Sequence, residues 1–309
     1  MTMLLISLRT MSATDTTAAA TTTASATRST TAAAPDRQPR RALVTGASAG
    51  IGAEFARQLA ARGTALTLTA RRGGRLAALA TELATAHGID VDWIAADLGD
   101  ATAPGIICDE LDRRGHRIDM LVNNAGYGVT GTLLANSWQV HAAQIQVMVS
   151  APTELCHRLL PGMRERRYGR IVNVSSLAGH VPAPAGHTLY APVKAYLIKF
   201  SQALALENEA FGVHVTALCP GFTYSEFHDA NGTRSTVSKK MPAWAWMPAD
   251  VVVREGLAAV ERGDVVCVNG RMNRLIKGLF KLIPDSLALR LIARQGRKFR
   301  VVEDAAGNH

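Results

Sequence analysis

Between Arg41 and about residue 270, short apolar segments rich in β-branched residues alternate with longer stretches of helical periodicity. This alternation predicts seven strands, at residues 42–45, 65–70, 91–96, 120–123, 170–174, 213–219 and 265–268. Helices fit between them, for example at residues 51–62, 75–86, 138–166 and 190–211. Strands this short and apolar, separated by helices, predict a parallel sheet covered on both faces. We therefore expect an α/β protein with a doubly wound, seven-stranded sheet in three α/β/α layers.

The charge of the chain is concentrated at its ends. The formal net charge is +9, but residues 42–270 carry 20 Lys/Arg and 20 Asp/Glu, whereas residues 271–300 carry nine basic and one acidic residue. A neutral central domain argues against a groove for polyanions, so no nucleic-acid partner is expected. With 48% hydrophobic residues, the chain can bury the core of one large domain.

The cysteines do not form a recognisable framework. The four of them lie far apart and show no CxxC or Cys/His pairing, so we expect neither a metal site nor disulfides: Cys108, Cys156, Cys219 and Cys267. No run of eighteen apolar residues is present, so no membrane-spanning helix is expected. These features favour a cytoplasmic location.

Three regions follow from composition. Residues 1–39 are mostly Ala, Thr and Ser without apolar periodicity, which predicts a disordered tail, with a targeting segment as the alternative. Residues 40–270 form the predicted α/β domain. The pattern of residues 271–309 predicts a basic amphipathic helical extension, which Pro284 divides into two helices. Two interpretations of this extension remain open: it packs against the domain or caps the cleft, or it makes peripheral contact with an anionic membrane surface.

A glycine-rich turn follows the first predicted strand and leads directly into a helix. Its sequence is Thr45-Gly46-Ala47-Ser48-Ala49-Gly50-Ile51-Gly52. Glycines at these positions allow a tight turn and a close approach to a pyrophosphate, which would lie at the positive end of the helix. We expect five residues of this turn to bind a dinucleotide: Gly46, Ser48, Gly50, Ile51 and Gly52.

This turn, TGASAGIG, resembles the cofactor turn of the classical short-chain dehydrogenases/reductases. Further motifs resemble that family in order and spacing over residues 41 to about 270: Asn123-Asn124-Ala125-Gly126, Asn173-Val174-Ser175-Ser176, Tyr190-Ala191-Pro192-Val193-Lys194 and Cys219-Pro220-Gly221. The resemblance implies a Rossmann-type fold and an oxidoreductase that interconverts a carbonyl and an alcohol in a small molecule. It also implies a homo-dimer or homo-tetramer.

The resemblance adds further cofactor contacts. They are Asp97, Leu98, Asn124, Ala125, Gly126, Pro220, Gly221 and Thr223. The choice of cofactor rests on the end of the second predicted strand, where an acidic residue would favour NAD. Arg71 and Arg72 stand there instead, and a guanidinium supplies the charge and donors that a 2′-phosphate needs. We therefore expect NADP(H).

Three residues are candidates for proton transfer. Reduction of a carbonyl builds negative charge on its oxygen, which needs a proton donor and a hydrogen bond. Tyr190 is the expected acid, and Lys194, one helical turn further on, would favour the phenolate. Both residues are also expected to contact the cofactor. Ser176 would donate a hydrogen bond to the substrate oxygen and matches the family's serine better than its neighbour Ser175.

One position departs from the family. An asparagine that helps to hold a water of the proton relay is replaced by Met148, and a thioether cannot substitute for an amide in this role. Either backbone groups hold the water, or turnover is slower. A catalytically weak or silent NADP-binding sensor or scaffold is therefore the alternative function.

Residues 222–247 are expected to form a flap over the substrate. Thr223 and Ser225 are placed to meet the nicotinamide carboxamide. Several flap residues are apolar or aromatic, which suggests a hydrophobic or acyl-type substrate, although they could equally serve to pack the flap: Phe222, Tyr224, Phe227, Trp244, Trp246 and Met247. His180 and His187 could line the edge of the pocket, and a non-catalytic role is expected for both.

Overall fold

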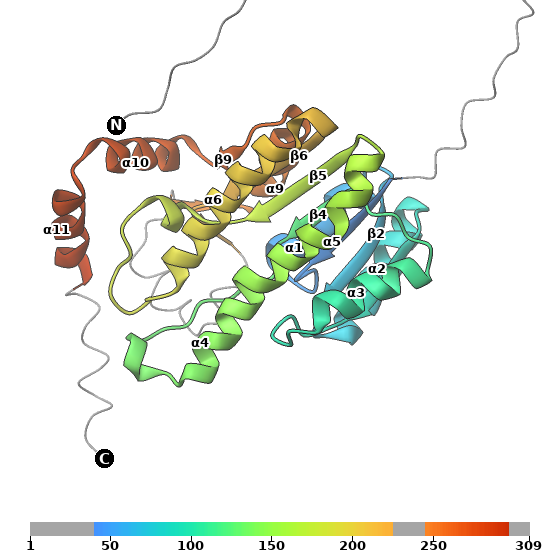
Figure 1. Cartoon of the computed structure of the whole chain (residues 1–309), viewed down its shortest axis with the longest axis horizontal. Coiled ribbons are helices and arrows are strands. Elements are labelled where there is room, and N and C mark those ends of the chain that lie inside the picture. Colours follow the sequence, from blue (N-terminus) through green and yellow to red (C-terminus); the bar gives the residue numbers. More distant parts are fainter. Residues whose placement is uncertain (1–39, 225–244, 297–309) are drawn as a thin grey trace, which may run out of the picture. The chain divides into compact units, whose positions relative to one another are not determined.

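One parallel sheet organises the protein. The computed structural model describes residues 40–224 and 245–296, with side chains described up to residue 293. The strand order is β3-β2-β1-β4-β5-β6-β9, and every pairing is parallel (Figure 1). The bounds are β1 Arg41–Thr45, β2 Ala65–Ala70, β3 Val91–Ala95, β4 Met120–Asn123, β5 Gly169–Val174, β6 Val213–Cys219 and β9 Val266–Val268. The predicted doubly wound, seven-stranded sheet is confirmed.

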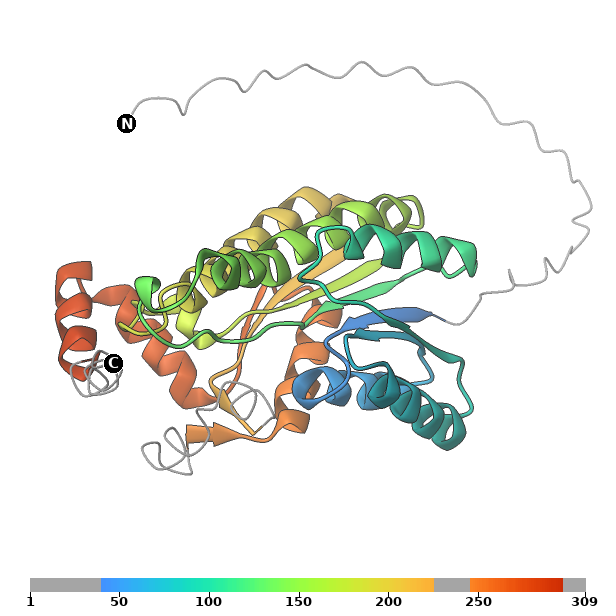
Figure 2. The same ribbon diagram turned by 90° about the horizontal axis from the view of Figure 1, so that it is seen from below.

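Helices cover both faces of the sheet, which gives three layers (Figure 2). One face packs against α1 (Gly50–Ala60), α2 (Gly73–His87) and α9 (Ala249–Arg262). The other packs against α3 (Ala103–Arg113), α5 (Ala151–Glu165) and α6 (Tyr190–Asn208). Two apolar cores result, because side chains alternate between the faces of a strand. Within β1, Val44 faces the first core and Leu43 the second.

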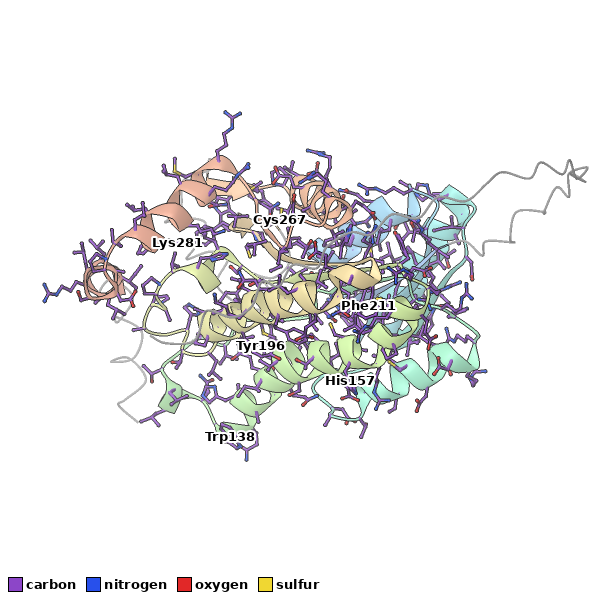
Figure 3. All side chains as sticks on the ribbon, turned by 45° about the horizontal axis from the view of Figure 1, so that its top comes forward. Trp138, His157, Tyr196, Phe211, Cys267 and Lys281 are labelled. Atoms are coloured by element: carbon purple, nitrogen blue, oxygen red, sulfur yellow. The ribbon has the colours of Figure 1, made fainter. Side chains whose placement is uncertain are left out.

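The helix expected at residues 138–166 is interrupted. It consists of α4 (Trp138–Ile145), a π-helical turn η2 (Gln146–Ser150) and α5. Pro152 supplies a physical reason, because it has no N–H for the Met148 carbonyl, four residues earlier, to accept. α5 and α6 lie side by side, and the hydroxyls of Thr153 and Tyr196 are 2.7 Å apart between them (Figure 3).

The remaining elements lie after β6. Two-residue strands β7 (Phe222–Thr223) and β8 (Trp246–Met247) pair in parallel and join the two ends of the predicted flap. The interior of that flap, including Ser225, Phe227 and Trp244, lies outside the described residues. Helices α10 (Arg271–Leu282) and α11 (Asp285–Gly296) follow β9. Across residues 40–224 and 245–296, no helix is both long and apolar enough to cross a membrane.

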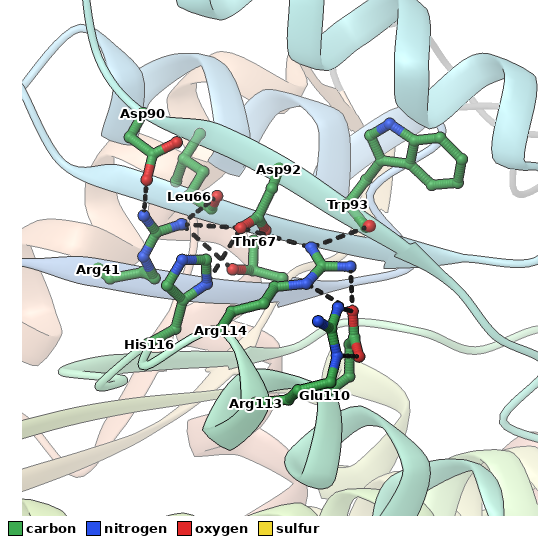
Figure 4. Close-up of polar contacts among 10 residues, drawn as sticks. All are labelled: Arg41, Leu66, Thr67, Asp90, Asp92, Trp93, Glu110, Arg113, Arg114 and His116. Atoms are coloured by element: carbon green, nitrogen blue, oxygen red, sulfur yellow. Dashed lines mark hydrogen bonds and ion pairs between the residues drawn. The ribbon is translucent and has the colours of Figure 1, made fainter.

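A polar network fastens the amino ends of β1, β2 and β3 (Figure 4). Arg41 is 7% exposed, forms an ion pair with Asp90, and lies 3.4 Å from a carboxylate oxygen of Asp92. It also donates to the Leu66 carbonyl over 2.9 Å. A buried guanidinium needs such partners, because an unpaired buried charge is costly. This network lies at the edge of the sheet opposite the predicted site residues.

Candidate active site

The parallel sheet brings the predicted site residues to one edge. The glycine turn follows β1, Arg71 and Arg72 follow β2, and Asp97 follows β3. The other predicted segments follow β4, β5 and β6, at residues 124–126, 175–176 and 220–221. All strands run in the same direction, so these segments converge beyond the carboxyl ends of the sheet, where doubly wound folds bind ligands (Figure 1).

The turn between β1 and α1 requires its glycines. Gly46 and Gly50 have φ of +66° and +55°, in the left-handed region that favours glycine. A Cβ on Gly52 would lie 2.4 Å from the Gly46 carbonyl oxygen, so the turn folds tightly onto the first turn of α1. Ala49 at the N-cap has no side-chain oxygen, which leaves the first N–H groups of α1 without the usual side-chain acceptor. Such a helix end suits a pyrophosphate.

The segment after β4 holds this turn in place. The Asn124 side-chain amide donates to the carbonyls of Thr45, over 2.9 Å, and Gly46, over 3.3 Å. The backbone N–H groups of Asn124 and Ala125 donate to the Thr45 hydroxyl over 3.0 and 3.1 Å. The Asn124 side chain, expected to bind the cofactor, is thus engaged in shaping the glycine turn. Sequence alone does not show this, because the contact spans 79 positions.

Two arginines follow β2, and one of them contacts the glycine turn. Both are exposed, and the guanidinium of Arg72 donates to the Ser48 hydroxyl over 2.9 and 3.2 Å. Asp97 is exposed, and its carboxylate accepts the Gly99 N–H over 2.9 Å. The Leu98 side chain is 7% exposed and packs in the second core, so only the backbone of Leu98 is available to a cofactor. Donors suited to a phosphate therefore gather beside the turn.

The residues after β5 place one hydroxyl toward Tyr190. The Ser176 side chain lies close enough to the Tyr190 phenol to favour its ionised form, and it accepts the Ala178 N–H over 3.1 Å. Ser175, in contrast, is 2% exposed and donates to the Lys194 carbonyl over 2.6 Å. Adjacent residues of a strand point to opposite faces, so only one of the two serines can meet the tyrosine.

Tyr190 and Lys194 occupy the first turn of α6. Lys194 is 5% exposed, and its ammonium lies 5.6 Å from the centre of the Tyr190 ring. It donates to the Val174 carbonyl over 2.8 Å. Pro192 lies between them without breaking the helix, because the first turn lacks intrahelical N–H bonds. The spacing of four residues brings phenol and ammonium to the same side of α6.

Burial shifts the titration of both groups. It raises the pKa of the Tyr190 phenol, an effect that the nearby Ser176 side chain opposes. It lowers the pKa of Lys194 to about 8, because the ammonium loses solvation, while the nearby Cys219 acts in the opposite direction. A lysine with this pKa is still largely protonated near neutrality, so it supplies positive charge beside the phenol.

The turn after β6 completes this side of the site. The Pro220 carbonyl accepts the Leu177 N–H over 2.9 Å and lies 3.4 Å from the Ser176 hydroxyl. A Cβ on Gly221 would lie 2.5 Å from the side-chain nitrogen of Asn273 in α10, so α10 packs directly on this turn. Thr223, 5% exposed, donates to the Gly221 carbonyl over 3.2 Å. Asn273 did not emerge from the sequence, since no local pattern fixes which turn α10 covers.

Two histidines flank the serine and tyrosine. The pKa of His180 is lowered to about 4 by burial and by the charges of Lys277 in α10 and Lys199 in α6. Burial also lowers the pKa of His187, whose carbonyl accepts the Tyr190 N–H over 3.2 Å. Both imidazoles are therefore uncharged near neutrality.

Met148 lies behind the segment that follows β4. It is 1% exposed, and its Cε would lie 3.2 Å from a Cβ on Gly126. The thioether therefore fills apolar space within the π-helical turn η2. Met148, the residue that departs from the family motif, is therefore part of the apolar core.

Comparisons with known proteins agree with this arrangement. A family model described as short chain dehydrogenase matches residues 40–235. An uncharacterized oxidoreductase of Myxococcus xanthus is 38% identical over 192 residues, which cover 62% of this chain and 75% of that protein. A very-long-chain 3-oxoacyl-CoA reductase of Anas platyrhynchos is 29% identical over 269 residues, which cover 84% of this chain and 80% of that protein.

A solved structure shows the same fold. The short-chain dehydrogenase of Sphingobium yanoikuyae in complex with NADPH superposes with a TM-score of 0.69 and is 30% identical, covering 79% of this chain and 96% of that one. The family model covers more than half of the chain, and the sheet order and glycine turn agree with it. The chain therefore belongs to the short-chain dehydrogenase family of oxidoreductases, which act on alcohol and ketone groups.

Proposed function

We propose that the protein is an NADP-dependent oxidoreductase that interconverts a carbonyl and an alcohol, with Tyr190 as the acid and base. The observation that carries this proposal is the convergence of Ser176, Tyr190 and Lys194 beside a glycine turn suited to a pyrophosphate. The bound nicotinamide would supply or accept the hydride. The side chains described above would manage the proton.

In the direction of reduction, negative charge develops on the carbonyl oxygen of the substrate. Tyr190 donates its phenolic proton to that oxygen, and the neighbouring Ser176 hydroxyl donates a hydrogen bond to it. Burial alone disfavours the phenolate that this leaves on Tyr190. The Lys194 ammonium, 5.6 Å from the ring centre, offsets that cost by its positive charge.

The preference for NADP rests on the end of β2. Arg72 donates to Ser48 of the glycine turn, so its guanidinium borders the place where the adenosine ribose would lie, and Arg71 precedes it at the same strand end. A 2′-phosphate accepts hydrogen bonds from such groups in a fixed geometry. The Sphingobium yanoikuyae neighbour, solved with NADPH, supports the same choice.

A hydrophobic substrate fits the side of the site near β7 and β8. The Trp246 ring lies 5.4 Å from that of Phe222 and 5.1 Å from that of Tyr224, and Tyr224 is 53% exposed. Aromatic surface of this kind contributes apolar contact area. The duck relative is described as a very-long-chain 3-oxoacyl-CoA reductase, which supports a ketone with an apolar or acyl chain.

The test is a panel of ketones supplied with NADPH and NADH in parallel, monitored at the absorbance of the reduced cofactor. We expect turnover with NADPH, a loss of about 100- to 10,000-fold in Tyr190→Phe, and near-normal turnover in the matched variant Tyr196→Phe. Tyr196 lies on the same helix but bonds to Thr153 instead. Equal activity in Tyr190→Phe and the parent would refute the assignment of the acid.

A second function is favoured by Met148. Its apolar side chain fills the place where the family's relay asparagine is expected, and this would suit a protein that binds NADP without turnover. Fluorescence titration separates the two functions: tight NADPH binding together with no activity across the panel would identify a sensor or scaffold.

A further inference from the structure

The apolar stripe of α10 is divided between two environments. Ile276 and Phe280 are half-buried on the side that packs against the domain. The neighbouring flank of the helix consists of large apolar side chains that are exposed to solvent: Met272 (48%), Leu275 (65%), Leu279 (54%) and Leu282 (85%). A helix that only closed onto the domain would turn its apolar stripe inward. α10 instead presents part of that stripe to the outside.

Cationic side chains border the exposed apolar flank. Arg274 and Lys281 are both exposed and lie two helical turns apart along α10, and Arg271 stands at its start. The only acidic residue between positions 271 and 300 is Asp285, against nine basic ones. α10 therefore combines apolar side chains with a positive surface on its outer side.

α11 extends this surface. Leu287 and Leu291, one helical turn apart on α11, are 45 and 43% exposed, and Arg290 beside them is exposed. Both helices lie beyond the carboxyl ends of the strands (Figures 1 and 2), and Asn273 of α10 packs on Gly221 at the candidate active site. The start of α10 is therefore at the candidate active site, and α11 continues from the end of α10.

We propose that α10 and α11 dock the protein on the surface of an anionic phospholipid bilayer, with the exposed leucines entering the interface and the cations meeting the headgroups. This goes beyond the proposed catalytic function. Each helix has 12 residues, so it would lie on the bilayer and not span it. A second copy of the chain and an anionic bilayer are the two simplest partners for this surface. Two copies of so basic a surface would repel each other across a self-complementary interface, whereas an anionic bilayer attracts it.

The experiment is flotation of the full chain with vesicles of phosphatidylcholine alone or of phosphatidylcholine with 30% phosphatidylglycerol, at low and high salt. We expect binding to the anionic vesicles only, weakened by salt. Each cation near an anionic surface contributes about fivefold in affinity, so Arg274→Gln/Lys281→Gln should bind about 30-fold more weakly. Leu275→Glu/Leu279→Glu should abolish binding, since it places charge on the apolar flank.

Leu206→Glu is the matched control, because Leu206 is 78% exposed on α6, away from these helices. It should bind anionic vesicles like the parent. Failure of the parent to float with anionic vesicles, or equal binding by the parent and both double variants, would overturn the proposal. So would light scattering in vesicle-free buffer that shows Leu275→Glu/Leu279→Glu breaking an oligomer of the parent, since the surface would then join copies of the chain.

Discussion

A pair of glycine-to-alanine substitutions tests whether the glycine turn is both tightly packed and the cofactor site. Gly52 is the third residue of α1, and Gly74 is the second residue of α2. Alanine at either position gains about 0.5–1 kcal/mol from helix propensity. The steric consequences differ, because a Cβ on Gly74 meets nothing within 4 Å, whereas a Cβ on Gly52 would lie 2.4 Å from the Gly46 carbonyl oxygen. The comparison therefore isolates the packing of the turn.

The magnitudes follow from these contacts. Overpacking of a close-fitting site costs about 1–3 kcal/mol, so Gly52→Ala should lose about 1–2 kcal/mol after the helical gain, while Gly74→Ala should gain about 0.5–1 kcal/mol. For a domain of this size, 1 kcal/mol corresponds to about 2–4 °C, so the two thermal midpoints should differ by about 3–12 °C. Movement of the turn also displaces N–H groups that would face the pyrophosphate. The loss of one charge-assisted hydrogen bond weakens binding by about 10- to 150-fold.

Circular dichroism gives the midpoints, and NADPH fluorescence gives the dissociation constants. Gly74→Ala should bind NADPH as the parent does. If Gly52→Ala melts like Gly74→Ala, the turn is not packed as described. If it melts earlier but binds NADPH with the parent's affinity, the cofactor does not lie on this turn, and the proposed function loses its basis.

Four further predictions each concern one position or one pair of neighbouring residues. In Arg71→Ser/Arg72→Ser, the dissociation constant for NADPH should rise about 10- to 100-fold while that for NADH stays constant, since only the 2′-phosphate contact is lost; equal effects on both cofactors would contradict this. The folded-state pKa of His180, about 4, lies below the unfolded value, so only the unfolded chain gains a proton as pH falls from 6.5 to 4. Over that window the free energy of unfolding in urea should therefore drop by about 2 kcal/mol more in the parent than in His180→Asn, which keeps the drop due to other histidines with a lowered pKa, such as His187. Arg41→Met should lower this free energy by about 1–2 kcal/mol, because Asp90 loses its cation and the Leu66 carbonyl loses a donor while Asp92 keeps Arg114, yet leave NADPH affinity unchanged. Met148→Asn should raise kcat if the missing amide limits the relay, and a slower, folded enzyme would count against that idea.

The fold could be predicted from the sequence because its signals are local. Short β-branched runs and helical periodicity each span a few residues, and all seven strands were placed to within one residue. The Arg41 network could not be predicted, since it joins three strands through contacts up to 51 positions apart. The same limit applies to β7 and β8, which are two residues long and pair across 24 positions.

The site shows the same division between local and distant information. Motif order placed its segments at one sheet edge, because parallel strands end together. The sequence could not show that the Asn124 side chain holds the glycine turn, as that depends on how two turns meet. It likewise predicted an amphipathic helix at α10 without showing that the domain buries only one flank of its apolar stripe.

Met148 illustrates both the local and the structural kinds of information. From the sequence, the Met148 side chain is expected to weaken the proton relay, because a thioether cannot substitute for the amide that helps to hold the water. Its backbone carries a second consequence: a regular helix would pair the Met148 carbonyl with the N–H of residue 152, and Pro152 has none. The π-helical turn η2 forms where this pairing fails, and such turns are frequent at functional sites. Pro152 therefore explains why the helix is interrupted beside Met148, and Met148→Asn measures whether an added amide at this position speeds the proton relay.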